Sequence, residues 1–446
     1  MKRTVTSFFD KEYLEYAKYV VENRAIPSCI DGLKPTQRKV VYIANKIWKT
    51  GNEKPMKLFQ LAGRVAAEAF YHHGNTSLES SMVGMAQKFK NSLPLLEGVG
   101  QFGSLRSPAA GAPRYISAKL HPNFRLLYQD FDLLENKIEE GEKIEPAFFL
   151  PIVPTVILNG TSGIAVGFAT NILNRNPKDV IDACISILNN KSMKVLAPWI
   201  QVFKGTFTRD LENPKTWKIK GRHQVINTTT VKITSIPPNY TYERYEEILN
   251  LLLEKGIITS YDDNSSETIE YTLKFKRSIL NDLVSKGKLD NALRLNTQET
   301  ENLTTIDENG ELKIFDKAED IVNHFVGVRL EWYQTRKDYL INKTKKQLAL
   351  VTNKARFIKD IIDGKLKINN VPKDKIIAYL KMNAYDTVHG SYDYLLSMAI
   401  HSLTKERYEK LLQEKEGCII ALKVLKATDP KEMYLTDLKK LKASIK

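Results

Sequence analysis

The sequence is poor in cysteine, and it lacks any segment that would cross a membrane or direct secretion. Its 446 residues include only Cys29, Cys184 and Cys418, which are widely separated and form no CxxC pair. This spacing argues against a disulfide framework or a zinc site and is typical of a protein in a reducing cytosol. No apolar run is long enough to span a bilayer, and the first residues lack the apolar core of a signal peptide. We therefore expect a cytoplasmic protein of about two to four domains.

Positive charge, by contrast, is in excess. Lysine and arginine number 67 against 52 aspartate and glutamate residues, which gives a formal net charge of +15 at pH 7. Basic proteins of this size often bind polyanions such as nucleic acids. Lysine-rich surfaces also occur on many proteins that bind no nucleic acid specifically, so charge alone does not decide the function.

The apolar pattern changes along the chain and divides it into three parts. Residues 1–150 are mostly helical with a glycine-rich stretch, residues 151–318 are mixed, and residues 319–446 are helical again. In the middle part, alternating residues such as 229–234 predict a strand. The fold class is therefore α+β, mostly α, and we expect one domain for each of the three ranges.

The last part contains two long amphipathic segments. Apolar residues recur at three- or four-residue steps over residues 322–362 and again over residues 403–425. Two helices that leave a body, pass through a small globule and return predict an antiparallel coiled-coil arm. Two ordinary core helices would have the same periodicity. The apolar set of the second segment is Tyr408, Leu411, Leu412, Ile419, Leu422 and Leu425.

Three helices are expected before the glycine-rich stretch. Pro35 suits the first turn of a helix, and a second helix fits residues 61–71. A third helix should begin near Thr76, which has capping-box spacing to Glu79. Short helices followed by a strand-like, glycine-rich stretch predict a helix-turn-helix with a wing, although many small helical domains share this pattern.

Several longer strings are more specific than these patterns. They are DGLKPTQRKV at 31–40, LAGRVAAEAFYHHG at 61–74, GQFGSLRSPAAGAPRY at 100–115 and LNGTSGIAVGFATNI at 158–172. In this order and at these separations, they closely resemble the breakage-reunion core of type IIA DNA topoisomerases. Further strings resemble the eukaryotic and tailed-phage branch of that family: PWIQVFKGTF, VRLEWYQTRKDYL and YDYLLSMAIHSLTKERYEKL. The resemblance spans nearly the whole chain.

This resemblance implies an architecture and a set of partners. The architecture is a winged-helix domain that carries the nucleophile, a mixed α/β tower domain, and a coiled-coil arm that ends in a small helical dimer gate. The implied assembly is a homodimer on double-stranded DNA that works with a Toprim/ATPase subunit. That partner would bind the Mg²⁺ and the ATP, so no metal site is expected in this chain. We expect DNA relaxation and decatenation without negative supercoiling, in the host cytoplasm if the chain is encoded by a phage.

The resemblance assigns the chemistry to Tyr115, the tyrosine of the family's RY motif. A tyrosine phenol has an ordinary pKa of about 10, so its attack on a phosphodiester needs help, which Arg114 can supply by stabilising charge on the phosphate. The product would be a 5′-phosphotyrosine, which conserves the bond energy for resealing. Arg24 matches a catalytic position. One of His72 and His73 should contact the scissile phosphate or the tyrosine, and the resemblance does not say which.

A second group of residues is expected to hold DNA. Lys34, Arg38 and Ile164 match family positions, and the others are basic residues in the same parts of the chain. Basic side chains would grip phosphates, and an isoleucine would wedge between base steps and bend the duplex. Taken singly, a solvated surface charge or a buried core isoleucine is the commoner reading. Asn75 departs from the family, which usually has an acidic residue there. The expected DNA-binding residues are Lys34, Arg38, Lys39, Arg64, Ile164 and Lys204.

Two other functions are compatible with parts of this pattern. A DNA-bending protein without enzymatic activity could retain the scaffold, but the adjacent Arg114 and Tyr115 favour an enzyme. A tyrosine recombinase would need its own arginine and histidine cluster on a different scaffold, and the sequence has no recognisable cluster of that kind. The trapping of a covalent protein–DNA adduct would distinguish an enzyme from an architectural protein.

Overall fold

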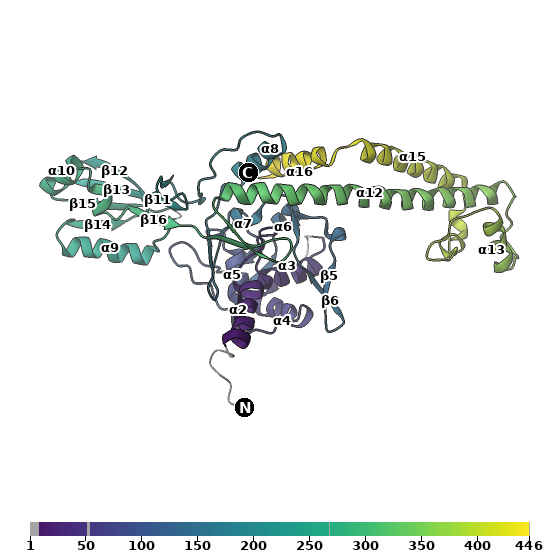
Figure 1. Ribbon diagram of the computed structural model, residues 1–446, viewed down its shortest axis with the longest axis horizontal. Coiled ribbons are helices and arrows are strands. Elements are labelled where there is room, and N and C mark those ends of the chain that lie inside the picture. The colour runs from purple at the N-terminus through teal and green to yellow at the C-terminus, as the bar shows by residue number, and fades with distance from the viewer. Residues whose placement is uncertain (1–8, 51–53, 267, 446) are drawn as a thin grey trace, which may run out of the picture. The chain divides into compact units, whose positions relative to one another are not determined.

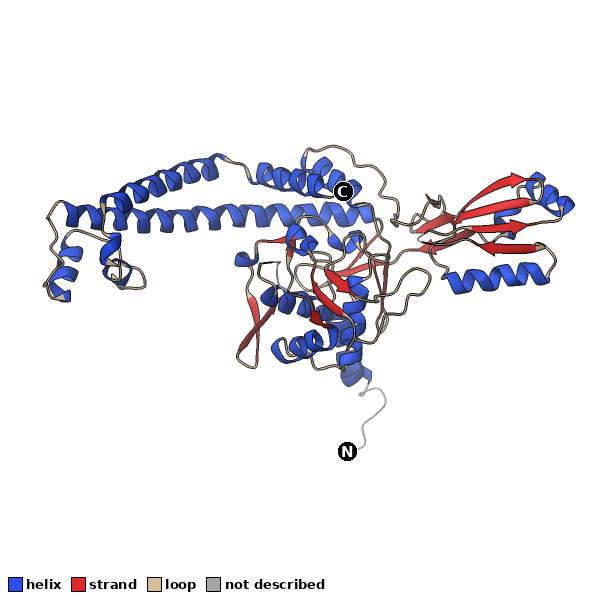
Figure 2. Ribbon diagram, turned by 180° about the vertical axis from the view of Figure 1, so that it is seen from behind, coloured by secondary structure: helices blue, strands red, loops and turns tan. Residues whose placement is uncertain are grey.

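The computed structural model describes residues 9–50, 54–266 and 268–445. The chain forms two compact units, residues 1–329 with 437–446 and residues 330–436 (Figures 1 and 2). Within the described residues, none of the helices combines the length and the apolar character that a membrane span requires. The fold contains both helices and antiparallel strands, which agrees with the coarser part of the predicted α+β class.

A run of helices opens the first unit. α3 begins as predicted, because Pro35 occupies its first turn and the Gln37 side chain accepts the backbone N–H of Lys34 at 3.0 Å. Its apolar residues Val40 and Ile43 are fully buried, and α3 packs against both α4 and α5. The helices are η1 (Phe9–Tyr13), α2 (Leu14–Val20), η2 (Val21–Ala25), α3 (Pro35–Ile47), α4 (Leu58–Glu68) and α5 (Asn75–Ala86).

The starts of α4 and α5 differ from the prediction. α4 begins at Leu58, ahead of the expected range, and the Leu58 side chain is fully buried. α5 begins at Asn75 after Gly74, and no side chain caps its first turn. The expected capping box of Thr76 and Glu79 is therefore wrong, because both residues already lie inside the helix.

A small antiparallel sheet carries the segment that leads to Tyr115. It consists of β1 (Met56–Lys57), β2 (Leu96–Val99) and β3 (Ser117–Leu120) in the order β1-β3-β2. Val99 pairs with Ser117, so residues 100–116 form one long connection between two neighbouring strands. Tyr115 therefore lies close to a fixed strand end.

Short elements make up the next part of the first unit. β4 pairs with β7, β5 with β6, and β8 with β9, and each pair is antiparallel. Ile164 and Ala169 are partners at the turn end of the β8–β9 hairpin. The elements are α6 (Pro122–Leu127), β4 (Tyr128–Gln129), η3 (Phe131–Leu133), β5 (Asn136–Glu139), β6 (Glu142–Pro146), β7 (Leu150–Pro151), α7 (Thr155–Leu158), β8 (Thr161–Ile164), β9 (Ala169–Ile172) and α8 (Pro177–Leu188).

Most of the strand residues lie further along the first unit. The strand predicted at 229–234 is present as β13, and its alternating Val231 and Ile233 are fully buried. They share a core with Tyr245 and Leu249 of α9. Two sheets have the orders β10-β11-β16 and β12-β13-β15-β14, and β17 pairs with β18. The elements are β10 (Thr206–Arg209), β11 (Thr216–Lys220), β12 (Arg222–Asn227), β13 (Thr230–Ser235), α9 (Tyr242–Glu254), β14 (Ser260–Asp263), β15 (Tyr271–Lys274), α10 (Arg277–Ser285), α11 (Leu289–Ala292), β16 (Asn296–Thr300), β17 (Leu303–Ile306) and β18 (Leu312–Phe315).

The second unit is helical. Long helices occupy both segments where the sequence predicts them, α12 and α15. Val351 and Ile358 of α12 pack with Leu411 of α15, and Lys337 donates a hydrogen bond to the carbonyl of Lys426. These contacts show that the two helices run in opposite directions (Figure 1). The helices from here to the end are α12 (Ala318–Ile362), α13 (Lys373–Met382), α14 (Asp393–Leu396), η4 (Ile400–Ser402), α15 (Lys405–Ala427) and α16 (Pro430–Ser444), of which α12 begins and α16 ends in the first unit.

The apolar face predicted for the second long helix is only partly correct. Leu411 and Leu422 are buried, but Leu412 and Ile419 are 39% and 41% exposed. Between the two long helices, α13 and α14 enclose a separate small core around Leu380 and its apolar neighbours. The globule that the sequence predicts between the helices therefore exists.

Candidate active site

Tyr115 combines a fixed backbone with an exposed side chain. Its backbone N–H donates to the carbonyl of Ala112 at 2.8 Å, and its own carbonyl accepts the Lys57 ammonium at 2.9 Å. The next residue, Ile116, accepts the N–H of Leu58 at the start of α4. The side chain of Tyr115 is nevertheless 70% exposed. A phenol held in this way can meet a large substrate without a rearrangement of the backbone.

Arg114 lies beside that phenol. Its guanidinium carbon is 4.9 Å from the centroid of the Tyr115 ring, a distance at which a cation is attracted to an aromatic face. Both residues are exposed. An arginine in this position can offer planar N–H donors to the oxygens of a phosphate that the phenol attacks. The structure therefore brings the two predicted catalytic residues together.

The two histidines have different surroundings. His73 Nε2 is 2.8 Å from the Tyr19 hydroxyl, and its ring makes an edge-to-face contact with Tyr71 at 5.4 Å. His72 Nε2 is 3.2 Å from a carboxylate oxygen of Glu139, and its side chain is 68% exposed. No sequence pattern pointed to Tyr19 or Glu139, because both are distant in sequence from the histidine pair. Of the two rings, that of His73 is the more firmly oriented.

Lys34 supports the hairpin that carries Ile164. Its ammonium donates to the carbonyl of Ser162 at 2.7 Å, and burial lowers the pKa of this lysine below its ordinary value. A Cβ added to Gly163 would lie 2.3 Å from the carbonyl of Ala25 and 3.0 Å from the Lys34 ammonium, so the hairpin passes very close to both. The close packing of Ser162 and Gly163 contrasts with the next residue, Ile164, which is 88% exposed. An isoleucine that is so exposed is not a core residue.

Arg38 corrects the prediction that it grips a flanking phosphate. It is 5% exposed, and its guanidinium donates to both carboxylate oxygens of Asp31, at 2.6 and 2.9 Å. A third bond goes to the carbonyl of Leu33 at 3.0 Å. Burial and pairing leave this guanidinium no access to a DNA backbone. We therefore assign Arg38 a structural role.

Lys39 is also turned toward protein groups. Its ammonium donates to the carbonyl of Ala69 and lies 3.1 Å from Glu145 and 3.7 Å from Glu139, with 14% of its side chain exposed. This network joins α3 to the β5–β6 hairpin. A role in gripping phosphate does not fit such a placement, because the charge is already neutralised by two carboxylates.

The remaining predicted contacts are on the surface. Arg24 is exposed at the end of η2. Arg64 is exposed and forms an i,i+4 ion pair with Glu68 at 2.6 Å. Lys204 is exposed, and its backbone N–H donates to the side chain of Ser235. All three charges are accessible to a polyanion.

One set of side chains is grouped like metal ligands within the described part of the chain. Cys29, Glu308 and His324 have ligand atoms within 4.8 Å of one another. Burial raises the pKa of the Cys29 thiol to about 12, with Glu308 as the next contribution. The Lys313 ammonium is 3.2 Å from His324 Nδ1. A buried thiol and an adjacent lysine do not suit Mg²⁺, which prefers oxygen ligands.

The chain is similar to proteins of known activity. It matches the family model for the A subunit of DNA gyrase/topoisomerase IV over residues 24–442. It is 34% identical to the DNA topoisomerase medium subunit of Enterobacteria phage T4, and the match covers 99% of each chain. It is 32% identical to DNA topoisomerase 2 of Arabidopsis thaliana over 99% of this chain and 33% of that protein. The chain thus spans about a third of the length of the eukaryotic relatives that it matches.

A solved structure supports the same relationship. The DNA-binding, cleavage and re-ligation domain of Plasmodium falciparum topoisomerase II superposes on this chain with a TM-score of 0.88 at 33% sequence identity. The superposition covers 98% of this chain and 64% of that one. The shared fold therefore includes both units of the chain.

Proposed function

This chain belongs to the family of the DNA gyrase/topoisomerase IV A subunits, among the type II DNA topoisomerases, and on that premise we propose that it is the subunit that cleaves and rejoins DNA. The full activity is an ATP-dependent passage of one duplex through a transient double-strand break in another, which relaxes and decatenates DNA. The observation that carries the proposal is the exposed pair of Arg114 and Tyr115 at a fixed strand end.

The proposed cleavage step is an exchange of phosphodiester bonds. The Tyr115 oxygen loses its proton and bonds to a backbone phosphorus, while the bond from that phosphorus to the 3′ oxygen breaks. The 3′ oxygen takes up a proton, and the 5′ phosphate remains on the tyrosine. Arg114 would stabilise the negative charge that grows on the phosphate oxygens. Because one phosphodiester replaces another, the reverse step reseals the strand without a further energy source.

The described residues suggest how each part of the chain would serve this reaction. We propose that residues 1–150 are a winged-helix cleavage domain and that residues 151–318 are a tower domain beside the DNA. Residues 319–446 would be a coiled-coil arm with a dimer gate at α13 and α14. The exposed Ile164 would wedge between base steps, at a cost of roughly a few kcal/mol of unstacking. Arg24, Lys34, Arg64 and Lys204 would contact phosphates.

The cofactors would be bound elsewhere in the assembly. Type II topoisomerases use Mg²⁺ and ATP, and the one cluster of possible ligands among the described residues does not suit Mg²⁺. We propose that a Toprim/ATPase partner binds both and that two copies of this chain form a homodimer, with one Tyr115 for each DNA strand. The assembly would act in the cytoplasm, which is the host's if the gene belongs to a phage.

The test is a cleavage assay on the holoenzyme reconstituted with its Toprim/ATPase partner. Tyr115→Phe should bind DNA normally but form no covalent adduct after denaturation with detergent, because only the nucleophilic oxygen is lost. Tyr16→Phe is the matched control, since Tyr16 is also exposed, at 55%, and has no assigned role. Adducts formed by the Tyr115→Phe enzyme would disprove the assignment of the nucleophile.

The same assay tests the alternative of a DNA-bending protein without enzymatic activity. If the wild-type holoenzyme bends DNA but never forms an adduct in the presence of Mg²⁺, the architectural function is correct and the proposed activity is wrong. The exposed Tyr115 beside Arg114 favours the enzyme, because a bending protein has no use for a nucleophile at this position.

A further inference from the structure

The connection that leads to Tyr115 is a closed lobe rather than an open loop. Gly111 donates its N–H to the carbonyl of Gln101 at 2.8 Å, which joins the two ends of the lobe. The Gln87 side chain, from the end of α5, donates to the carbonyls of Phe102 at 2.8 Å and Pro108 at 3.0 Å. These bonds fix the base of the lobe close to the nucleophile.

A glycine allows the lobe to close this tightly. Gly103 has a φ of +84°, which side chains of L residues rarely permit. A Cβ added to it would lie 2.5 Å from the carbonyl oxygen of Pro108. The two sides of the lobe are therefore in direct contact, so the position of its tip and the position of its base depend on each other.

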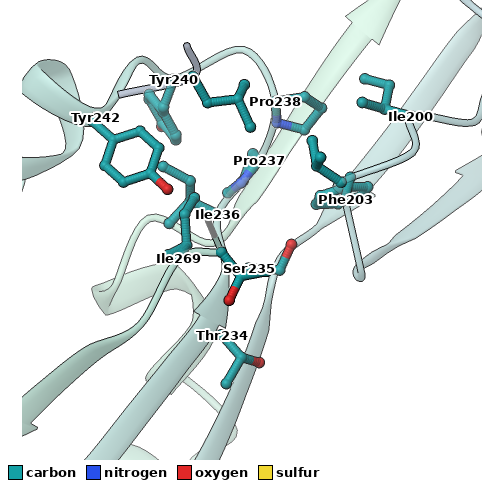
Figure 3. Close-up of a pocket in the computed structure, with 13 residues that line it drawn as sticks. Ile200, Phe203, Thr234, Ser235, Ile236, Pro237, Pro238, Tyr240, Tyr242 and Ile269 are labelled. Carbon is teal, nitrogen blue, oxygen red and sulfur yellow. The ribbon is translucent and has the colours of Figure 1, made fainter. Parts of the chain in front are cut away.

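The tip of the lobe is docked on the region that contains α9 and the β12-β13-β15-β14 sheet. Leu105 packs against the core of that region. Leu105 also lines a small cavity of about 50 Å³ together with Ile236, Tyr242 and Ile269. Figure 3 shows the latter three side chains beside Pro237 and Pro238. Arg106 forms an ion pair with Asp263 at the end of β14, with 2.8 Å between Nη2 and Oδ2.

We propose that Leu105 and Arg106 are positioning residues, which couple the region of α9 and the β12-β13-β15-β14 sheet to the nucleophile by anchoring the lobe that precedes Tyr115. The inference rests on the proposed function. Neither residue touches the reacting atoms. Each acts through the lobe, whose base ends at Gly111, and Ala112 then accepts the N–H of Tyr115.

The physical reason is the sensitivity of bond exchange to the placement of the nucleophile. A displacement of about 1 Å in a reacting group can cost on the order of a hundredfold in rate. Residues 100–116 connect two strands, and a free connection of this length would sample many conformations. An anchor at its tip removes most of them before DNA arrives.

A competing role for Arg106 is a direct contact with DNA, because its side chain is 55% exposed. The two roles make different predictions for Asp263, which is a carboxylate and would not attract a phosphate. If Arg106 grips DNA, the loss of Asp263 is harmless. If Arg106 anchors the lobe, the loss of Asp263 is as harmful as the loss of Arg106.

The experiment is a charge-swap cycle on the reconstituted holoenzyme. Single-turnover cleavage, DNA affinity and melting temperature are measured for Arg106→Asp, Asp263→Arg and the double variant. We expect each single variant to slow cleavage by about three- to tenfold. The double variant should return to within about twofold of wild type, since it restores the ion pair in reverse. Each rate is measured well below the melting temperature of its variant, because Asp263 is only 18% exposed and also accepts the backbone N–H of Ser265, so its replacement lowers stability as well.

Leu105→Ala tests the apolar part of the anchor. It should slow cleavage by about tenfold while DNA affinity stays within about twofold. Leu211→Ala and Arg244→Ala are the controls, because both residues are exposed and lie outside the docking contact. Arg244 is on α9, and Leu211 lies between β10 and β11 of the neighbouring sheet. Both controls should cleave at the wild-type rate.

Three results would overturn the inference. They are wild-type cleavage by Asp263→Arg, a double variant as slow as Arg106→Asp, and wild-type cleavage by Leu105→Ala. The first two would assign Arg106 to DNA contact. If the wild-type holoenzyme itself forms no covalent adduct, the proposed function is wrong. That outcome differs from the three above, in which the wild-type enzyme cleaves DNA and only the role of Leu105 or Arg106 is wrong.

Discussion

Arg38, in the family motif at residues 31–40, and Arg114, in the family motif at residues 100–115, have opposite surroundings in the structure. Arg38 is 5% exposed and bound by Asp31, whereas Arg114 is exposed and lies over the ring of Tyr115. The first holds parts of the protein together, and the second is available to a ligand. A basic residue in a shared motif therefore indicates DNA chemistry only where no buried carboxylate already binds it.

Asp31 explains why the first segment is structural. Its carboxylate accepts the N–H of Leu33 and that of Phe149, each at 3.0 Å, as well as both bonds from Arg38. Its carbonyl accepts the hydroxyls of Tyr128 and Thr155. One buried residue thus joins the start of α3 to a segment more than a hundred residues away. Among the residues that the structure describes, none forms an equivalent hub near the exposed end of residues 100–115, which suits a reactive site.

The largest expected effect is on stability and concerns the buried segment. Arg38→Ala should lower the free energy of unfolding by about 3–5 kcal/mol, because it leaves the Asp31 carboxylate buried without its counter-charge. Urea denaturation of the wild-type and variant chains measures this difference in the free energy of unfolding. Arg64→Ala is the control, since Arg64 is in a surface ion pair and should change stability by less than about 1 kcal/mol. Equal losses in the two variants would contradict the comparison.

The next effect is on catalysis and concerns the exposed segment. Arg114→Ala should slow cleavage by about 10²–10³-fold, since a donor aimed at the developing charge is lost. Its melting temperature should equal that of the wild type. Single-turnover cleavage by the reconstituted holoenzyme measures the rate, with Arg244→Ala as the control. A normal rate, or a lowered melting temperature, would show that Arg114 is structural as Arg38 is.

The histidines extend the comparison between fixed and exposed groups. His73→Ala should slow cleavage by about 10²-fold, the size of a lost acid–base or phosphate-contacting group, and by more than His72→Ala does. The reason is that Tyr19 and Tyr71 orient His73, whereas His72 is mostly exposed. Tyr19→Phe should give an intermediate rate. A larger defect in His72→Ala than in His73→Ala would reverse the assignment.

The smallest expected effect on binding concerns the exposed isoleucine. Ile164→Ala should reduce the bend angle of bound DNA, measured by FRET, while affinity changes by less than about threefold. Phosphate contacts dominate affinity, whereas a wedge acts on base stacking. Leu211→Ala, another exposed apolar side chain, is the control. A wild-type bend angle in Ile164→Ala would show that Ile164 is not a wedge.

The local parts of the fold were predictable from the sequence because they depend on neighbouring residues. Pro35 begins α3, the alternation around Val231 produces β13, and two long periodic segments become α12 and α15. The predicted start of α5 is wrong, because Gly74 precedes the helix without a capping side chain and Thr76 lies within it. A residue such as Thr76 cannot cap a helix that already begins before it.

Only part of the candidate site can be predicted from the sequence, because several of its contacts join residues that are far apart in the chain. Tyr115 and Arg114 are adjacent, so a motif was sufficient to find them. The structural role of Arg38 depends on burial, and the pairs Tyr19–His73 and Arg106–Asp263 join residues that are 54 and 157 positions apart. No periodicity or spacing in a single sequence reveals such contacts. The exposure of Ile164 is also a tertiary property, since an isoleucine is usually buried.

The most direct test of the central claim is to identify the residue that is linked to DNA. The reconstituted holoenzyme is incubated with a plasmid and Mg²⁺, denatured, and digested with nuclease and protease, and the nucleotide-bearing peptide is sequenced by mass spectrometry. The account predicts a single modified peptide with a 5′-phosphate on Tyr115. A nucleotide on any other residue, or linkage through a 3′-phosphate, would contradict it.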